Sequence, residues 1–187
     1  WDMISLNVRT PDEVLGDLQA QIASCKSGEK GMSELFDRYG VKKILNYGRQ
    51  LQDYAEKLTR AEIGGFPNGE FCFTDHIDGL GENPETLVIN AKVIISDNSI
   101  TVDFEGTSKQ VPAGVNPSFP FTKAATYAAL RSVMESDIPN CHGFTVPIKV
   151  KAPLGSLVNP KFPAPCGARG ITGYRIIDCL FGALSKA

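Results

Sequence analysis

The chain has 187 residues, of which 42% are hydrophobic and 21% are charged. These fractions are typical of folded globular proteins and exclude a disordered chain. With a formal net charge of -2 and no block of like charges, the sequence offers no electrostatic basis for binding nucleic acid or an anionic membrane surface. No apolar run approaches the roughly 18 residues that a membrane span needs.

The first third of the sequence has the pattern of a helical block, with helices expected over residues 10–31, 32–40 and 41–63. Thr10 can cap the first helix, and Pro11 fits its first turn. Apolar residues then recur at helical spacing. The segment GEKG at 28–31 is expected to end this helix, Gly40 to end the second and Gly64 to end the third.

From Pro67 onward the pattern changes to strands and turns. Residues 71–74, Phe-Cys-Phe-Thr, alternate with the two-residue period of a strand. Over residues 86–107, two β-branched runs flank the segment SDNS, so a β-hairpin is expected there. A helix, a strand and a closing helix are expected over residues 120–137, 144–153 and 171–187.

The order of these elements predicts the fold class. Pro147 lacks a backbone donor, so the strand that contains it belongs at a sheet edge or a bulge. Helices followed by strands and further helices indicate an α+β fold. We expect a helical segment over residues 1–66 and, in the same domain, a mixed, mainly antiparallel sheet with helices over residues 67–187.

The cysteines and the chain ends bear on the origin of the chain. The five cysteines contain no C-x-x-C pair, and such an odd, scattered set is typical of reduced thiols in a cytoplasmic protein. The sequence starts without a Met or a signal-peptide pattern and stops within a helix-like pattern. The chain is therefore expected to be an internal piece of a longer protein.

Two short segments carry residue types that bind metals or act as nucleophiles. His76 and Asp78 share one strand face and suit a metal ion, but no third ligand is evident nearby, and a turn is the favoured interpretation. Cys141 precedes His142, yet no orienting third group can be named, so a tight loop is favoured over a catalytic pair. No glycine-rich phosphate loop is present in the sequence.

A polar loop after residue 102 is the strongest candidate site. The stretch VDFEGTSKQVPAGVN contains neutral donors and acceptors of the kind that bind an amide or a carbonyl group. Composition alone leaves two interpretations open, a ligand-binding loop and an elaborate turn. Near the last helix, Arg169 and the first amides of that helix can face an anion, although a simple glycine-rich helix entry is the commoner arrangement.

Six segments resemble, in the same order, the landmarks of the hydantoinase B/oxoprolinase family. They are NVRTPDEVLGDLQAQIAS, LFDRYG, FPNGEFCFTDHIDGLG, ITVDFEGTSKQVPAGVN, KAPLGSLVNPKFPAPCGAR and RIIDCLFGAL. The resemblance covers essentially the whole chain. It departs from the family pattern at PNGEF, where members carry PDG-x-Y, and at Cys141 and His142, where members commonly carry N-x-G.

The resemblance implies part of an ATP-dependent enzyme that hydrolyses cyclic amides such as hydantoin or 5-oxoproline. ATP and Mg would be bound by a hydantoinase A-type partner, and ATP would activate the substrate by phosphorylating a carbonyl oxygen. The alternatives are a B-type subunit of an acetone or acetophenone carboxylase and a non-catalytic assembly fragment. An unrelated metal-dependent hydrolase is a weaker alternative. A divalent metal of the carboxylases would be held by a segment before Trp1, so no metal ligands are assigned within the chain.

The resemblance also selects site residues. The stretch from Asp103 to Asn116 matches the family landmark D-F-[ST]-G-[ST]-x-x-Q-x-x-x-x-x-N, which implies a substrate-facing loop or an inter-chain contact. The expected catalytic residues are Asp103, Thr107, Gln110 and Asn116. The expected substrate-binding residues are Arg9, Asp17, Gln21 and Arg169. Asp17 and Gln21 are four apart on one helix face, and structural polar bridging is the alternative for them.

Overall fold

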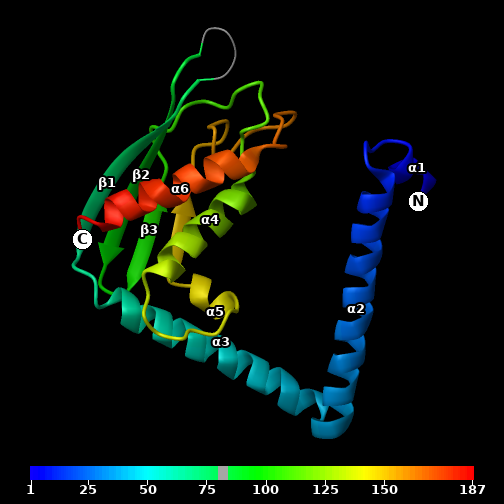
Figure 1. The fold of residues 1–187 in the computed structure, drawn as a ribbon. Coiled ribbons are helices and arrows are strands. Elements are labelled where there is room, and N and C mark those ends of the chain that lie inside the picture. Colours follow the sequence, from blue (N-terminus) through cyan, green and yellow to red (C-terminus); the bar gives the residue numbers. More distant parts are fainter. Residues whose placement is uncertain (80–83) are drawn as a thin grey trace. The chain divides into compact units, whose positions relative to one another are not determined.

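The computed structural model describes residues 1–79 and 84–187, and it divides into two compact units, residues 1–50 and 51–187 (Figure 1). The end of the segment FPNGEFCFTDHIDGLG lies outside the described residues. The N-terminal helical segment ends at Ile63, whereas the boundary between the two units falls within the last helix of that segment. Among the described residues, no helix has both the length and the apolar character needed to cross a membrane.

The first unit is helical, with α1 over Asp2–Ser5 and α2 over Pro11–Tyr39. Pro11 opens the helix, as expected, and Gly40 ends it at a φ of 84°. Thr10 occupies the N-cap position, but its side chain makes no capping hydrogen bond. The prediction that GEKG ends a helix at residue 31 is wrong, because α2 continues through it. Glycine in a helix costs only about 1 kcal/mol relative to alanine, so without a terminating cap the helix continues.

The third helix, α3, spans Val41–Ile63. Its part from Leu51 onward belongs to the second unit and buries Ala55, Thr59 and Ile63, which are four residues apart and therefore lie on one face. Gly64 and Gly65 follow directly, so the expected helix end is confirmed.

The second unit contains a four-stranded sheet in the order β1-β2-β3-β4. The strands are β1 Gly69–Ile77, β2 Leu87–Ser96, β3 Ser99–Asp103 and β4 Ile148–Lys151. The first three strands pair antiparallel, and β3 pairs with β4 in parallel. The α+β class, the hairpin and the edge position of the last strand are confirmed. The last strand is shorter than expected because Phe144 and Thr145 belong to a short helix, α5 His142–Thr145.

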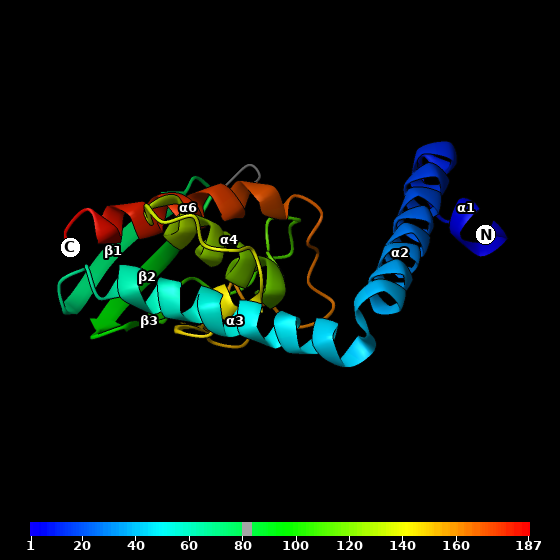
Figure 2. The same cartoon turned by 90° about the horizontal axis from the view of Figure 1, so that it is seen from below.

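Two longer helices cover one face of the sheet. The helix α6, Arg169–Leu184, packs across β1 and β2, and α4, Phe119–Ser132, packs beside α6 (Figures 1 and 2). Alternate residues of β2 from Leu87 to Ile95 are buried, which is the strand period expected for one covered face. Ile176, Leu180 and Ala183 recur at helical spacing and bury the inner face of α6.

Candidate functional site

Two loops meet beyond the carboxyl ends of β3 and β4. These strands are parallel neighbours, so their ends lie at the same edge of the sheet, and the segments that follow them are brought together. We call residues 104–116 the first loop and residues 152–168 the second loop. The backbone N–H of Leu157 donates to Ser108 O at 2.8 Å, and that of Gln110 donates to Gly155 O at 3.0 Å.

A pocket of about 570 Å³ lies between the two loops. We call it the two-loop pocket; it is lined by Glu105, Gly106, Thr107, Lys109, Gln110, Pro153, Leu154, Gly155, Ser156 and Lys161. Its lining therefore mixes charged, polar and apolar groups, which is the composition of a site for a small polar ligand. Two of the four residues expected to be catalytic, Thr107 and Gln110, belong to this lining.

Gln110 fastens the two loops together through its side chain. Its Nε2 donates to Lys161 O at 3.2 Å, and its Oε1 accepts from the backbone N–H of Lys161 at 2.6 Å. The amide thus makes the two hydrogen bonds that the backbone of a neighbouring strand would otherwise make with Lys161. Gln110 both lines the pocket and fixes the position of Lys161 on the opposite wall.

Thr107 ties the first loop to the sheet. Its Oγ1 accepts from the backbone N–H of Asn90 at 3.2 Å and lies 3.3 Å from Asn90 O. The Asn90 side chain donates to Gly106 O at 3.0 Å. Gly106 has a φ of 83°, and a Cβ atom there would lie 2.7 Å from Asn90 Nδ2, so a glycine is required for this close approach.

Asp103 is the last residue of β3 and Asn116 is the last residue of the first loop, and neither lines the pocket. Asp103 Oδ1 accepts from the backbone N–H of Glu105 at 3.0 Å, and its Oδ2 lies 4.0 Å from Lys151 Nζ. Asp103 therefore stabilises the turn that opens the loop. Its expected catalytic role stays a prediction.

Asn116 is fully buried, and backbone groups satisfy its amide. Its Oδ1 accepts from the N–H of Val111 at 3.0 Å, while its Nδ2 donates to the carbonyl oxygens of Val111, Ala113 and Pro165 at 2.8, 2.7 and 2.8 Å. These bonds close the first loop and join it to the second. The side chain acts as a structural clamp, and a catalytic role for it stays a prediction.

The residues expected to bind substrate are divided between the two units. In the second unit, Arg169 begins α6, where its Nη1 donates to Cys166 O at 3.2 Å and its guanidinium lies 5.4 Å from the Phe121 ring centre. In the first unit, Arg9 and Asp17 are exposed. Within the described chain, no hydrogen bond joins Asp17 to Gln21.

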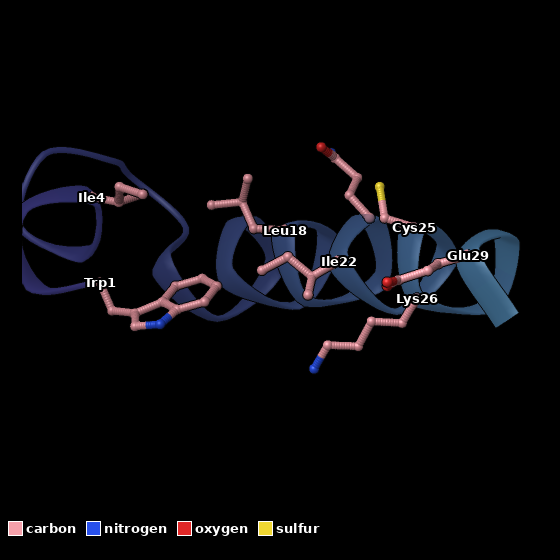
Figure 3. Close-up of a pocket in the computed structure, with 8 residues that line it drawn as sticks. Trp1, Ile4, Leu18, Ile22, Cys25, Lys26 and Glu29 are labelled. Atoms are coloured by element: carbon pink, nitrogen blue, oxygen red, sulfur yellow. The ribbon is translucent and has the colours of Figure 1, made fainter.

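Gln21 lines a separate pocket of about 560 Å³ in the first unit. The other lining residues are Trp1, Ile4, Leu18, Ile22, Cys25, Lys26 and Glu29, which come from α1, α2 and the first residue of the chain (Figure 3). This lining is mainly apolar. It therefore offers few of the polar groups that orient a cyclic amide.

The two segments that carry metal-binding or nucleophilic residue types, around His76 and around Cys141, make structural contacts. Asp75 forms an ion pair with Arg175 at 3.4 Å, and the described residues contain no group of three or more His, Cys, Asp or Glu side chains arranged to hold a metal ion. Cys141 Sγ lies 4.0 Å from Leu51 O, whereas His142 Nδ1 lies 3.1 Å from Thr145 Oγ1. Cys141 is the N-cap of the short helix α5 and His142 is its first residue, so the segment expected to be a tight loop enters a helical turn.

Sequence reasoning did not select Lys109, Ser156 or Lys161 as site residues, although they line the pocket. The signal that points to two of them is the segment KAPLGSLVNPKFPAPCGAR, which carries part of the family resemblance. Its position opposite the first loop follows from the parallel pairing of β3 with β4, which the sequence pattern does not reveal.

Comparisons with known proteins give consistent results. The family model described as hydantoinase B/oxoprolinase matches residues 1–187. The B-type subunit of a putative D-/L-hydantoinase from a Pseudomonas species is 34% identical over 198 residues, which covers 100% of this chain and 33% of that protein. The chain thus spans about a third of the length of this curated relative.

Two solved structures share the fold. The crystal structure of the ATP-dependent caprolactamase from Pseudomonas jessenii matches with a TM-score of 0.91 and 28% identity, covering 100% of this chain and 32% of that one. Acetone carboxylase in its nucleotide-free form matches with a TM-score of 0.79 over 96% of this chain and 25% of that one. Its 16% identity shows a common fold alone.

Proposed function

Because the chain belongs to the hydantoinase B/oxoprolinase family, we propose that it forms part of the B-type subunit of an ATP-dependent enzyme that hydrolyses cyclic amides. The observation that carries this proposal is the match of the whole chain, at a TM-score of 0.91, to an ATP-dependent caprolactamase. Caprolactam is itself a cyclic amide. Hydantoin and 5-oxoproline are the substrates that the family name suggests.

We assign ATP and Mg to a hydantoinase A-type partner, with which the protein forms a hetero-oligomer. Relatives named as a hydantoinase subunit of the B type and as the β subunit of caprolactamase support a division of the enzyme between chains. The described residues of this chain present no cluster suited to Mg²⁺, so no nucleotide chemistry is assigned to them. We place the complex in the cytoplasm, in keeping with its five free cysteines.

Within this chain we propose that the two-loop pocket faces the substrate. Thr107 and Gln110 supply neutral hydrogen-bonding groups at the pocket, while Asp103 and Asn116 hold the loop that carries them. Arg169, which follows the second loop and donates to Cys166 O, is proposed as a further substrate contact. Arg9, Asp17 and Gln21 belong to the first unit and are proposed as a second, separate contact.

The test is ATP turnover by the complete B-type polypeptide that carries this chain, with and without its A-type partner. ADP release is measured with hydantoin, 5-oxoproline or caprolactam, and with acetone plus bicarbonate. We expect release that depends on both the partner and a cyclic amide, with ring-opened product formed in step. Turnover with acetone and bicarbonate alone would instead assign a ketone carboxylase, and no stimulation by any substrate would leave an assembly role.

A further inference from the structure

A buried serine hydroxyl without a hydrogen-bond partner belongs to the wall of the two-loop pocket. Ser156 is 4% exposed, and its Oγ has no partner among the described residues. Buried polar groups are nearly always hydrogen-bonded, and an unpaired one is destabilising unless a ligand, a water or an ion completes it. The Ser156 hydroxyl therefore has a hydrogen-bonding capacity that the described residues do not use.

Two lysines, one from each loop, line the same pocket. Lys109 comes from the first loop and Lys161 from the second. In the part of the chain that the structure describes, neither lysine forms a salt bridge. Glu105 is the acidic residue of the lining, so two lysines against one glutamate leave the pocket net positive. A net positive, partly enclosed wall favours an anion.

The backbone holds these groups in register with one another. Lys109 and Ser156 are partners in an antiparallel bridge, and directly opposed residues of such a bridge present their side chains to the same side. The Gln110 amide fixes the backbone of Lys161 through two hydrogen bonds of 2.6 and 3.2 Å. The stem of Lys161 runs beside Gly155, where a Cβ atom would lie 3.6 Å from its Cε.

We propose that the two-loop pocket binds a small oxyanion, a carboxylate or a phosphate. The ammonium groups of Lys109 and Lys161 flank the anion, and the Ser156 hydroxyl donates a hydrogen bond to it. The hydroxyl is covered in this conformation, so its donation to the anion requires rotation about the Cα–Cβ bond to another staggered position. The assignment deepens the proposed function, because it names the chemical group that the pocket would hold.

The experiment titrates the complete polypeptide that carries this chain, selectively ¹⁵N-labelled at glycine and serine, with two probes, sodium phosphate and sodium 5-oxoprolinate. Ionic strength is held constant with sodium chloride, so that general screening of charge does not change. We expect saturable shifts of the backbone amide signals of Gly106, Gly155 and Ser156. The probe that saturates at the lower concentration identifies the preferred oxyanion. Shifts that do not saturate, and that sodium chloride alone reproduces, would overturn the proposal.

Two lysine variants separate a specific site from a general effect of charge. Lys161→Gln is expected to weaken binding about tenfold, the scale of one charge-assisted hydrogen bond. The control Lys149→Gln makes the same change of charge on β4, at an exposed residue outside the lining, and is expected to bind as the wild type does. Equal weakening by both variants would overturn the proposal.

Ser156→Ala supplies a readout that a merely structural serine would not give. Removing an unpaired buried hydroxyl is expected to leave the melting temperature unchanged or higher, while oxyanion binding becomes weaker. Unchanged binding would remove Ser156 from the site. Because binding is measured without a partner or nucleotide, its failure overturns the oxyanion site alone, whereas amide-independent ATP turnover in the complex overturns the proposed function alone.

Discussion

Replacing Asn116 with alanine tests whether this residue holds the two loops together. Its amide makes four hydrogen bonds, all to backbone groups of the first and second loops. Asn116→Ala deletes these bonds and leaves one backbone N–H and three carbonyl groups to find other partners. The side chain is fully buried, so water does not replace the amide without disturbing the loops.

The expected loss follows from the count of bonds. The amide NH2 carries two hydrogens, which its three carbonyl acceptors share, so with the bond that Oδ1 accepts the side chain supplies the equivalent of three hydrogen bonds. A net contribution of about 1 kcal/mol for each predicts a loss of about 3 kcal/mol in the free energy of unfolding. For a chain of this length, such a loss lowers the melting temperature by about 6–12 °C. The effect is large for a single polar substitution, most of which cost about 1 kcal/mol.

Urea and thermal unfolding followed by circular dichroism measure this change. The matched control is Asn140→Ala, since Asn140 is exposed and makes no side-chain hydrogen bond within the described residues. We expect the control to remain within about 0.5 kcal/mol of the wild type. An Asn116→Ala protein whose free energy of unfolding lies within about 1 kcal/mol of the wild type would refute the role of Asn116 as a clamp.

Further predictions concern the second unit. The Ser136 hydroxyl, aided by the N–H of Glu135, lowers the pKa of Glu62 below 4.5, so the stability that its carboxylate provides is present above that pH and is lost as the pH falls through the lowered pKa. The stability of the wild type relative to Glu62→Gln should therefore decrease as the pH falls through the lowered pKa of Glu62, and a constant difference would contradict this. Burial, with a smaller contribution from Asp75, raises the pKa of Cys179 to about 12, so iodoacetamide at pH 8 should alkylate Cys179 only in denaturant, as read by mass spectrometry. Gly143→Ala should destabilise the fold by at least about 2 kcal/mol in urea, because the new Cβ would lie 2.1 Å from Gln52 O; an unaffected midpoint would show that α5 moves freely away from α3.

Local rules predicted those elements whose ends are set by local chemistry. Thr10 and Pro11 begin α2, Gly40 ends it, and the Asp97–Asn98 turn joins β2 to β3. The segment at 28–31 failed because glycines alone disfavour a helix without ending it. A stop requires a residue in a non-helical conformation, as Gly40 has at a φ of 84°.

The candidate site was predictable only in part. Sequence reasoning selected Thr107 and Gln110, which line the two-loop pocket, because their residue types and the family resemblance both pointed to this loop. It did not distinguish them from Asn116, whose amide is satisfied by backbone groups up to 49 residues away. Nor does any local pattern indicate that Ser156 Oγ lacks a partner, since that depends on how the second loop packs against the first.

The most direct measurement is a crystal structure of the complete complex with a bound cyclic-amide analogue. We predict that the analogue lies against the two-loop pocket, within hydrogen-bonding distance of Thr107 or Gln110. A ligand bound elsewhere, with the two-loop pocket open to bulk solvent and remote from every neighbouring chain, would contradict the proposal that this pocket faces the substrate.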